Sequence, residues 1–154
     1  MSELITKKLT GGWTIEYKEV KPAPITGVAE WVADLRSGKH IQGCNGNLRS
    51  LHDEFCCLGR KADLEHVKWE MEKDGEFPRG YRAGESTTHY TGNCGLSRSG
   101  GLPCRISFYS PENVFRGTSD TLTSINDEGV PFPVIADIIE LLFVEKESQA
   151  KPAA

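Results

Sequence analysis

Four arginines stand in a glycine-rich stretch from residue 75 to residue 105, where the acidic residues are Glu76 and Glu85. Glycine leaves backbone N–H groups open to an anion, and the arginine fork binds phosphate in a bidentate manner. Tyrosine rings in the same stretch can stack on a base. We therefore predict that the stretch binds a small anionic nucleotide through Arg79, Tyr81, Arg82, His89, Tyr90, Arg98 and Arg105.

Another interpretation of this stretch stays open. It contains neither the G-x-x-x-x-G-K-[ST] phosphate loop nor a strand-linked G-x-G-x-x-G, so it does not indicate a known nucleotide fold. Its length and its glycine content also predict an ordinary surface loop. A surface loop without a ligand is the alternative.

One histidine in the stretch has a suggestive sequence context. His89-Tyr90-Thr91 has the H-x-T form that two-histidine phosphoesterases use in pairs. The histidines at positions 40, 52 and 66 do not supply a second copy of the form. A phosphoesterase acting through His89 is therefore a third-ranked hypothesis, and the sequence predicts no complete catalytic constellation.

The five cysteines point to buried thiols. Their number is odd, and Cys56 and Cys57 are adjacent, which is a poor basis for a disulfide framework. Zinc is the sharper alternative, but no C-x₂-C or H-x₃₋₅-H pair has the usual spacing. Apolar flanks favour burial, which raises the pKa of a thiol and makes it inert. We expect no metal site and no cofactor.

The C-terminal third is acidic. Residues 120–147 contain seven acidic residues and a single basic residue, Lys146. A helix–turn–helix reading of residues 119–143 is therefore disfavoured, because this surface would repel phosphate. Asp137 and Glu140 share a helix face and indicate a solvated acidic surface. We expect no DNA partner. The acidic face supports a second hypothesis, an inhibitor that binds a host protein.

Composition sets the broad class. The chain has 154 residues, 38% hydrophobic and 26% charged, with a formal net charge of −4. These values fit one globular domain over residues 1–147, with a disordered tail over 148–154. No run approaches the roughly 18 apolar residues that span a bilayer, and no signal-peptide core is present. We expect a cytoplasmic protein that does not bind membranes.

The elements that would position these residues follow from periodicity. Residues 2–20 alternate around Trp13, Ile15 and Tyr17 and predict a β-hairpin. A helix is expected over Val28–Ser37, then a turn or broken strand over 39–51. A buried segment, Phe55–Gly59, should lead into a helix reaching about Lys73.

The later elements are a strand at Cys104–Ser110, a short helix capped by Thr118 or Ser119, and a second helix from about Pro133. The tail from Glu145 should be frayed. The expected fold is therefore α+β: a single domain with an N-terminal β-hairpin and a small antiparallel sheet packed on three or four helices.

Three separated motifs carry a resemblance. They are Trp31–Lys39 followed by Gln42-Gly43, then Phe55–Gly59, then Leu122–Asp127 with Gly129, Phe132, Ile135-Ala136 and Ile139-Glu140. Together they resemble a family of small uncharacterised bacteriophage and prophage proteins. The resemblance covers about a third of the chain; the hairpin and the Gly/Arg stretch fall outside it. It implies a phage setting and a shared helical core, and no reaction.

These observations combine into a ranked set of functions. The first is a phage accessory protein that counteracts host defence by sequestering a small nucleotide immune signal in the host cytoplasm. The second is the inhibitor of a host defence protein, acting through the acidic surface. The third is the phosphoesterase. A homo-oligomer is compatible with each.

Overall fold

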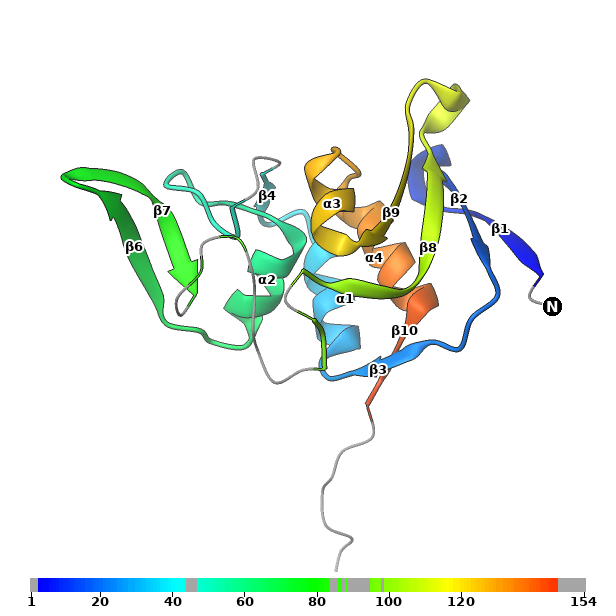
Figure 1. Ribbon diagram of the computed structural model, residues 1–154, viewed down its shortest axis with the longest axis horizontal. Coiled ribbons are helices and arrows are strands. Elements are labelled where there is room, and N and C mark those ends of the chain that lie inside the picture. Colours follow the sequence, from blue (N-terminus) through cyan, green and yellow to red (C-terminus); the bar gives the residue numbers. More distant parts are fainter. Residues whose placement is uncertain are drawn as a thin grey trace, which may run out of the picture.

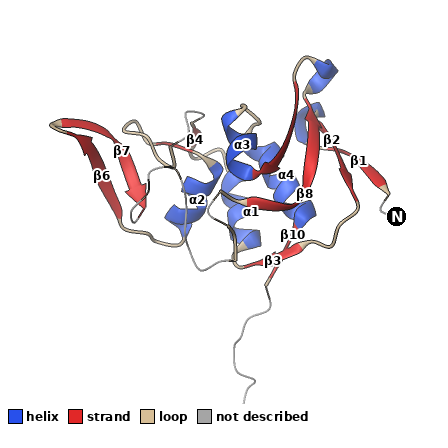
Figure 2. Ribbon diagram, viewed as in Figure 1, coloured by secondary structure: helices blue, strands red, loops and turns tan. Residues whose placement is uncertain are grey.

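The computed structural model describes residues 3–43, 47–83, 86, 88, 95–97 and 99–146. Within them, helices and small sheets form one α+β arrangement, in which the helices lie between a twisted sheet on one side and a projecting hairpin on the other (Figure 1; Figure 2). The expected fold class is confirmed. None of the helices in the described part of the chain is long and apolar enough to cross a membrane.

The main sheet has the strand order β1-β2-β8-β9, with antiparallel neighbours throughout. Its strands are β1 (Leu4–Lys8), β2 (Thr14–Lys18), β8 (Gly101–Tyr109) and β9 (Arg116–Thr121). The 3₁₀ turn η1 (Thr10–Gly12) joins β1 to β2, as the predicted hairpin requires, and η2 (Pro111–Asn113) lies between β8 and β9. Ile15 pairs with Phe108 and both are buried, so one face of the sheet covers the core.

Four described helices make up the rest of the core: α1 (Val28–Arg36), α2 (Cys57–Leu64), α3 (Leu122–Asp127) and α4 (Phe132–Leu142). Trp31 and Leu35 of α1 are buried, as are Ile135 and Ile139 of α4, at the 3.6-residue spacing that the sequence shows. Pro133 stands in the first turn of α4, where its missing N–H is not needed. The predicted apolar stripe on this helix is confirmed.

Short strand pairs join distant parts of the chain. β3 (Ala23–Ile25) runs parallel to β10 (Phe143–Glu145), and β4 (Ile41–Gln42) runs parallel to β5 (Glu54–Phe55). The antiparallel hairpin of β6 (Trp69–Asp74) and β7 (Phe77–Ala83) projects from the body, at the left of Figure 1. At its base it meets the segment around Arg49, which is where the candidate site forms.

Three expectations about elements are wrong. The predicted helix to Lys73 ends at Leu64, because His66 takes a left-handed backbone (φ 61°) and Trp69 begins a strand. Part of the predicted long loop, Phe77–Ala83, is strand β7, stabilised by its pairing with β6. The cap of α3 is Thr121, whose hydroxyl accepts a hydrogen bond from Ser124 N–H, since residues 118 and 119 belong to β9.

The tail also differs from expectation at its start. Residues 143–145 form β10 and pair with β3. Both carboxylate oxygens of Glu145 accept hydrogen bonds at the start of α1, from Gly27 N–H at 2.8 Å and Val28 N–H at 3.0 Å. The carboxylate therefore caps the positive end of that helix. The predicted disordered segment 148–154 lies outside the described residues.

Candidate functional site

Arg49 joins two of the small sheets. Its backbone forms bridges to Phe55 and to Tyr81, and Tyr81 N–H donates to the Arg49 carbonyl at 3.1 Å. The β4–β5 pair and the β6–β7 hairpin therefore meet at this residue. Because backbone pairing fixes the residue on both sides, its side chain emerges at a fixed position between the two sheets.

Aromatic rings surround the Arg49 guanidinium. Its Cζ lies 4.4 Å from the centroid of the Tyr81 ring, 5.4 Å from that of Phe55 and 5.6 Å from that of Trp69. The Phe55 and Trp69 rings meet edge to face, with centroids 6.3 Å apart. A guanidinium over aromatic faces gains from cation–π attraction and keeps the N–H groups at its edge available for hydrogen bonds. In this structure those N–H groups bind Asp53: its Oδ1 lies 2.7 Å from Arg49 Nη2 and 2.8 Å from Arg49 Nε.

A buried ion-pair network lies beneath these rings. Arg60 donates two hydrogen bonds to Asp34 and one to Asp63, each at 2.8 Å, and stands over Phe55 with Cζ 4.6 Å from the centroid. Burial alone would lower the pKa of Arg60, but its bonds to the two carboxylates outweigh burial and raise it. Arg60 thus stays charged and makes a cation–π contact with the Phe55 ring.

Asp63 connects this ion-pair network to Trp69, one of the rings around Arg49. Its other oxygen accepts a hydrogen bond from Trp69 Nε1 at 3.0 Å. Burial would raise the pKa of Asp63, but the bonds from Trp69 and Arg60 and the nearby charges of Arg60 and Arg49 lower it below its ordinary value. Asp63 is therefore ionised at neutral pH.

A cavity of about 370 Å³ opens beside Arg49, and we call it the Arg49 pocket. Its lining consists of Lys39, His40, Ile41, Arg49, His52, Asp53, Phe55 and Asp63. The His40 ring packs edge-on against Phe55, with centroids 5.7 Å apart, and His40 Nε2 lies 3.8 Å from Asp34. The pocket thus combines cationic and titratable groups, carboxylates and an apolar wall, which is the mixture found in small-molecule sites.

The predicted site residues divide among several places. Tyr81 does not line the Arg49 pocket, but its ring stacks against the Arg49 guanidinium, with Cζ 4.4 Å from the ring centroid. Arg82 is bound by Glu70 at 2.9 Å and Glu72 at 3.0 Å within its own hairpin. Arg79 is exposed, with its nearest carboxylate, Asp74, at 3.7 Å.

Arg105 points from the surface of β8, in the other sheet, so the structure does not bring it together with Arg79 and Arg82. The predicted residues His89, Tyr90 and Arg98 lie outside the described part of the chain.

Sequence reasoning missed Arg49, His40 and His52 as site residues. They come from separate turns that the sequence shows only as polar segments around the Phe55 motif. The one available signal was position: Arg49 and His52 lie just before the apolar Phe55–Leu58 run, where a buried strand brings its neighbours against the core.

A buried amide pair holds β4, which forms one side of the pocket. Asn126 is fully buried; its Oδ1 accepts hydrogen bonds from Cys57 N–H at 3.1 Å and Gln42 Nε2 at 3.0 Å, and its Nδ2 donates to the Gly43 carbonyl at 2.7 Å. Gln42 Nε2 also donates to the Val130 carbonyl at 2.7 Å. Every polar atom of the Asn126 side chain therefore has a partner, and β4 is fixed to α2 and α3.

The vicinal cysteines are structural. Cys56 Sγ caps α2 by accepting a hydrogen bond from Gly59 N–H at 3.3 Å, and Cys57 is fully buried. Burial raises the pKa of Cys56 to about 12 and that of Cys57 well above its ordinary value. The prediction of buried thiols is confirmed for this pair, since neither forms a thiolate at neutral pH.

The comparison with protein-family models identifies a family. A family model described as "Domain of unknown function (DUF8296)" matches residues 27–143. No curated protein and no solved structure matches the chain. The matched range contains the whole lining of the Arg49 pocket and excludes β1 and β2.

Proposed function

The chain belongs to the DUF8296 family, and we propose that it is a binding protein that holds a small nucleotide in the Arg49 pocket. The proposal includes the phage setting that the sequence resemblance implies. The ligand would then be a nucleotide signal of host defence, which the protein removes by sequestering it.

One observation carries the proposal: a guanidinium stacked on Tyr81 presents its edge to a cavity that Lys39, His40 and His52 also line. A stacked arginine is already ordered, so it loses little side-chain entropy when a phosphate binds. The carboxylate of Asp53, its present partner, is 61% exposed. A phosphate can therefore replace Asp53 and return that carboxylate to water.

The formal charges of the lining are close to balance. Its two cations, Lys39 and Arg49, are matched by two carboxylates, Asp53 and Asp63. A phosphate that takes the place of Asp53 on Arg49 therefore replaces one anion with another.

The remaining surface of the pocket suits a base. Ile41 lines the cavity and is 64% exposed, which leaves an apolar rim beside the cationic groups. A nucleobase can cover this rim while its phosphate contacts Arg49, and Asp53 or Asp63 can accept hydrogen bonds from base amino groups.

The test is a thermal-shift and native-mass screen of the purified protein with cyclic dinucleotides, cyclic trinucleotides and ADP-ribose. Arg49→Lys keeps the charge and removes the bidentate fork, so it should weaken binding about tenfold or more, since a hydrogen bond to a charged group contributes about 1.5–3 kcal/mol. His52 is exposed, so His52→Ala should fold normally, and it should weaken binding because the imidazole lines the cavity.

Arg82→Ala is the matched control. Its guanidinium is already bound by Glu70 and Glu72, so this variant should bind as the wild type does. Wild-type affinity in both Arg49→Lys and His52→Ala would refute the Arg49 pocket as the site. Loss of binding in Arg82→Ala alone would instead support the β7 arginines that the sequence suggested.

A phosphoesterase, ranked third and assigned to His89 from the sequence, moves to second place on other residues, because His40 and His52 line one cavity and a histidine pair can supply a general acid and a general base. The ligand recovered after incubation separates the two candidates: intact nucleotide supports sequestration, whereas a cleaved product that disappears in His52→Ala supports catalysis.

The inhibitor hypothesis has less support from the acidic face. Arg36 binds Asp137 at 2.7 Å and Glu140 at 3.0 Å, and Glu145 caps α1. Much of the negative charge that the sequence suggested is thus used within the fold. A host-protein complex that weakens steeply with salt would revive this hypothesis.

A further inference from the structure

A second cavity lies on the outer face of the main sheet. It has a volume of about 710 Å³, within the range of ligand pockets, and its lining is Thr6, Gly12, Thr14, Glu16, Tyr109, Ser110, Glu112 and Asn113. Strand alternation explains the set: Ile15 and Phe108 point into the core, so their neighbours Thr14, Glu16 and Tyr109 point outward. We call this the sheet-face pocket.

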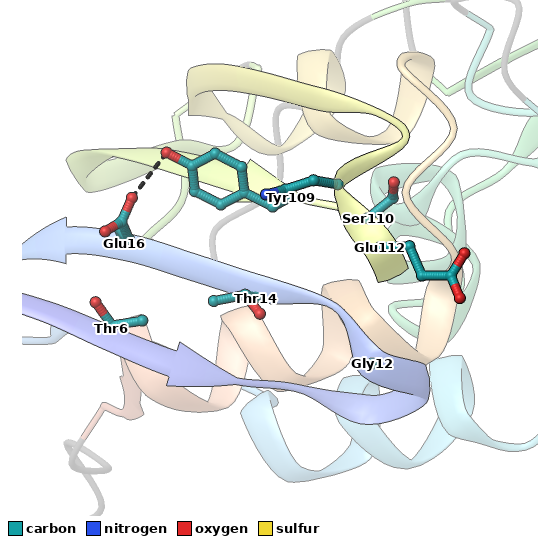
Figure 3. A pocket seen from close by; sticks show the side chains of 8 residues that line it. Thr6, Gly12, Thr14, Glu16, Tyr109, Ser110 and Glu112 are labelled. Carbon is teal, nitrogen blue, oxygen red and sulfur yellow. Dashed lines mark hydrogen bonds between the residues drawn. The ribbon is translucent and has the colours of Figure 1, made fainter.

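Tyr109 organises this pocket. Its ring extends from β8 across the face of β2, and its hydroxyl donates a hydrogen bond to Glu16 Oε1 at 2.7 Å (Figure 3). That bond raises the pKa of Tyr109, so the phenol stays protonated and its oxygen can accept a further hydrogen bond. The side chains of Thr6 and Thr14 lie on the same face (Figure 3). The pocket thus presents an aromatic surface beside hydroxyl and carboxylate oxygens.

The charge around the pocket is balanced. The eight lining residues, all described, include no lysine or arginine and two glutamates, Glu16 and Glu112. Lys8 and Arg116 flank it, because Lys8 pairs with Thr14 across β1 and β2, and Arg116 pairs with Tyr109 across β9 and β8. A neutral ligand rich in hydroxyl groups fits these conditions better than a phosphate or a polyamine does.

The two turns close one end of the pocket. Gly12 in η1 has a left-handed backbone (φ 87°), and a side chain there would lie against Pro111 of η2, with Cβ 3.4 Å from the proline ring. Glycine adopts this backbone without strain, and a Cβ at the position would make only an ordinary contact with Pro111. From these turns the lining continues along β1 and β2 to Thr6 and Glu16, a length that suits a chain-like ligand.

We infer that the sheet-face pocket binds a neutral oligosaccharide. The apolar face of one sugar ring stacks on Tyr109, and vicinal hydroxyls donate to Glu16 and exchange hydrogen bonds with Thr6 and Thr14. The site rests on different residues from the Arg49 pocket, and β1, η1 and β2, which together supply half of its lining, precede the range that the family model matches. Saccharide binding would therefore be a separate property of this chain.

The experiment is an amide NMR titration of the ¹⁵N-labelled protein with maltotriose, cellotriose and triacetylchitotriose, each to about 10 mM, and separately with spermine. One trisaccharide should shift the amides of Thr14, Glu16 and Tyr109. Tyr109→Ala should weaken that binding about tenfold, equivalent to about 1.4 kcal/mol. Tyr109→Phe keeps the ring and should retain most of the affinity, while Arg49→Lys should retain all of it.

Each outcome decides the inference. Shifts confined to this face with a trisaccharide, lost in Tyr109→Ala and kept in Arg49→Lys, support it whatever becomes of the nucleotide proposal. No shift with any of the three sugars overturns it, as does a response to spermine alone. Thr14→Val removes one hydroxyl with little change in volume, so unchanged affinity in both Thr14→Val and Tyr109→Ala would also overturn it if the fold is intact.

Discussion

Replacing Asn126 with aspartate tests the buried amide network directly. The change is nearly isosteric, but it puts an oxygen where Nδ2 now donates to the Gly43 carbonyl at 2.7 Å. In a fully buried position this oxygen must either carry a proton or face another acceptor. The folded protein will therefore favour the protonated acid, so the pKa of the new carboxyl should rise above the ordinary aspartate value of about 3.9.

The magnitude follows from proton linkage. A group whose pKa is raised on folding destabilises the protein increasingly as the pH rises above its unfolded value, by 1.36 kcal/mol per pH unit, until its folded pKa is reached. If the acid stays protonated to pH 7, Asn126→Asp costs about 4 kcal/mol relative to pH 4, which is a large part of the stability of an ordinary domain.

Urea denaturation of wild type and variant at pH 4, 5, 6 and 7 measures this difference. The wild type at each pH removes the contribution of the other titrating groups. Asn113→Asp, in an exposed turn, is the control and should show little dependence on pH. A loss for Asn126→Asp that is below about 1 kcal/mol and the same at every pH would refute the buried network as described.

The remaining predictions concern single contacts. Gly59→Ala should cost about 3 kcal/mol or more in urea denaturation, because the new Cβ would lie 2.7 Å from the carbonyl carbon of Leu48; a stable variant would show that α2 does not pack so closely on that segment. Glu145→Gln should cost about 0.5–1 kcal/mol, through loss of the charge at the start of α1, and added salt should reduce the difference. Asp63→Asn should destabilise the protein at neutral pH. Folding lowers the pKa of Asp63, so its ionised carboxylate stabilises the protein fully above the ordinary aspartate pKa, and this stabilisation is lost as the pH falls through the lower folded pKa. The free energies of unfolding of wild type and Asp63→Asn should therefore converge as the pH falls toward 2.

The sequence predicts the helical core well and the projecting hairpin poorly. The stripe on α4 is visible because 3.6-residue periodicity and burial coincide there. The segment 69–74 consists mainly of glutamate, lysine and methionine, which favour helices in isolation, yet it forms β6 because β7 pairs with it along its whole length. Partner strands that stabilise such a segment cannot be seen in its own composition.

The sequence analysis predicted one residue at the candidate site, Tyr81, but it did not predict which side chains come together there. Tyr81 was identified from its ring and its neighbouring arginines, and its ring contacts the Arg49 guanidinium behind the pocket lining. The guanidinium that it contacts belongs to a residue 32 positions earlier, brought there by the isolated bridge between Arg49 and Tyr81. Bridges of this kind depend on the packing of whole elements, so residue spacing does not reveal them.

The cap of α1 has a consequence for biosynthesis. The carboxylate that stabilises the first turn of this helix is separated from Val28 by 117 positions. On the ribosome, α1 emerges long before Glu145 and must wait with its first N–H groups uncapped, and β3 waits without its partner β10. The nascent chain can therefore collapse around α1 early, but it completes this corner of the fold only after residue 145 has left the exit tunnel.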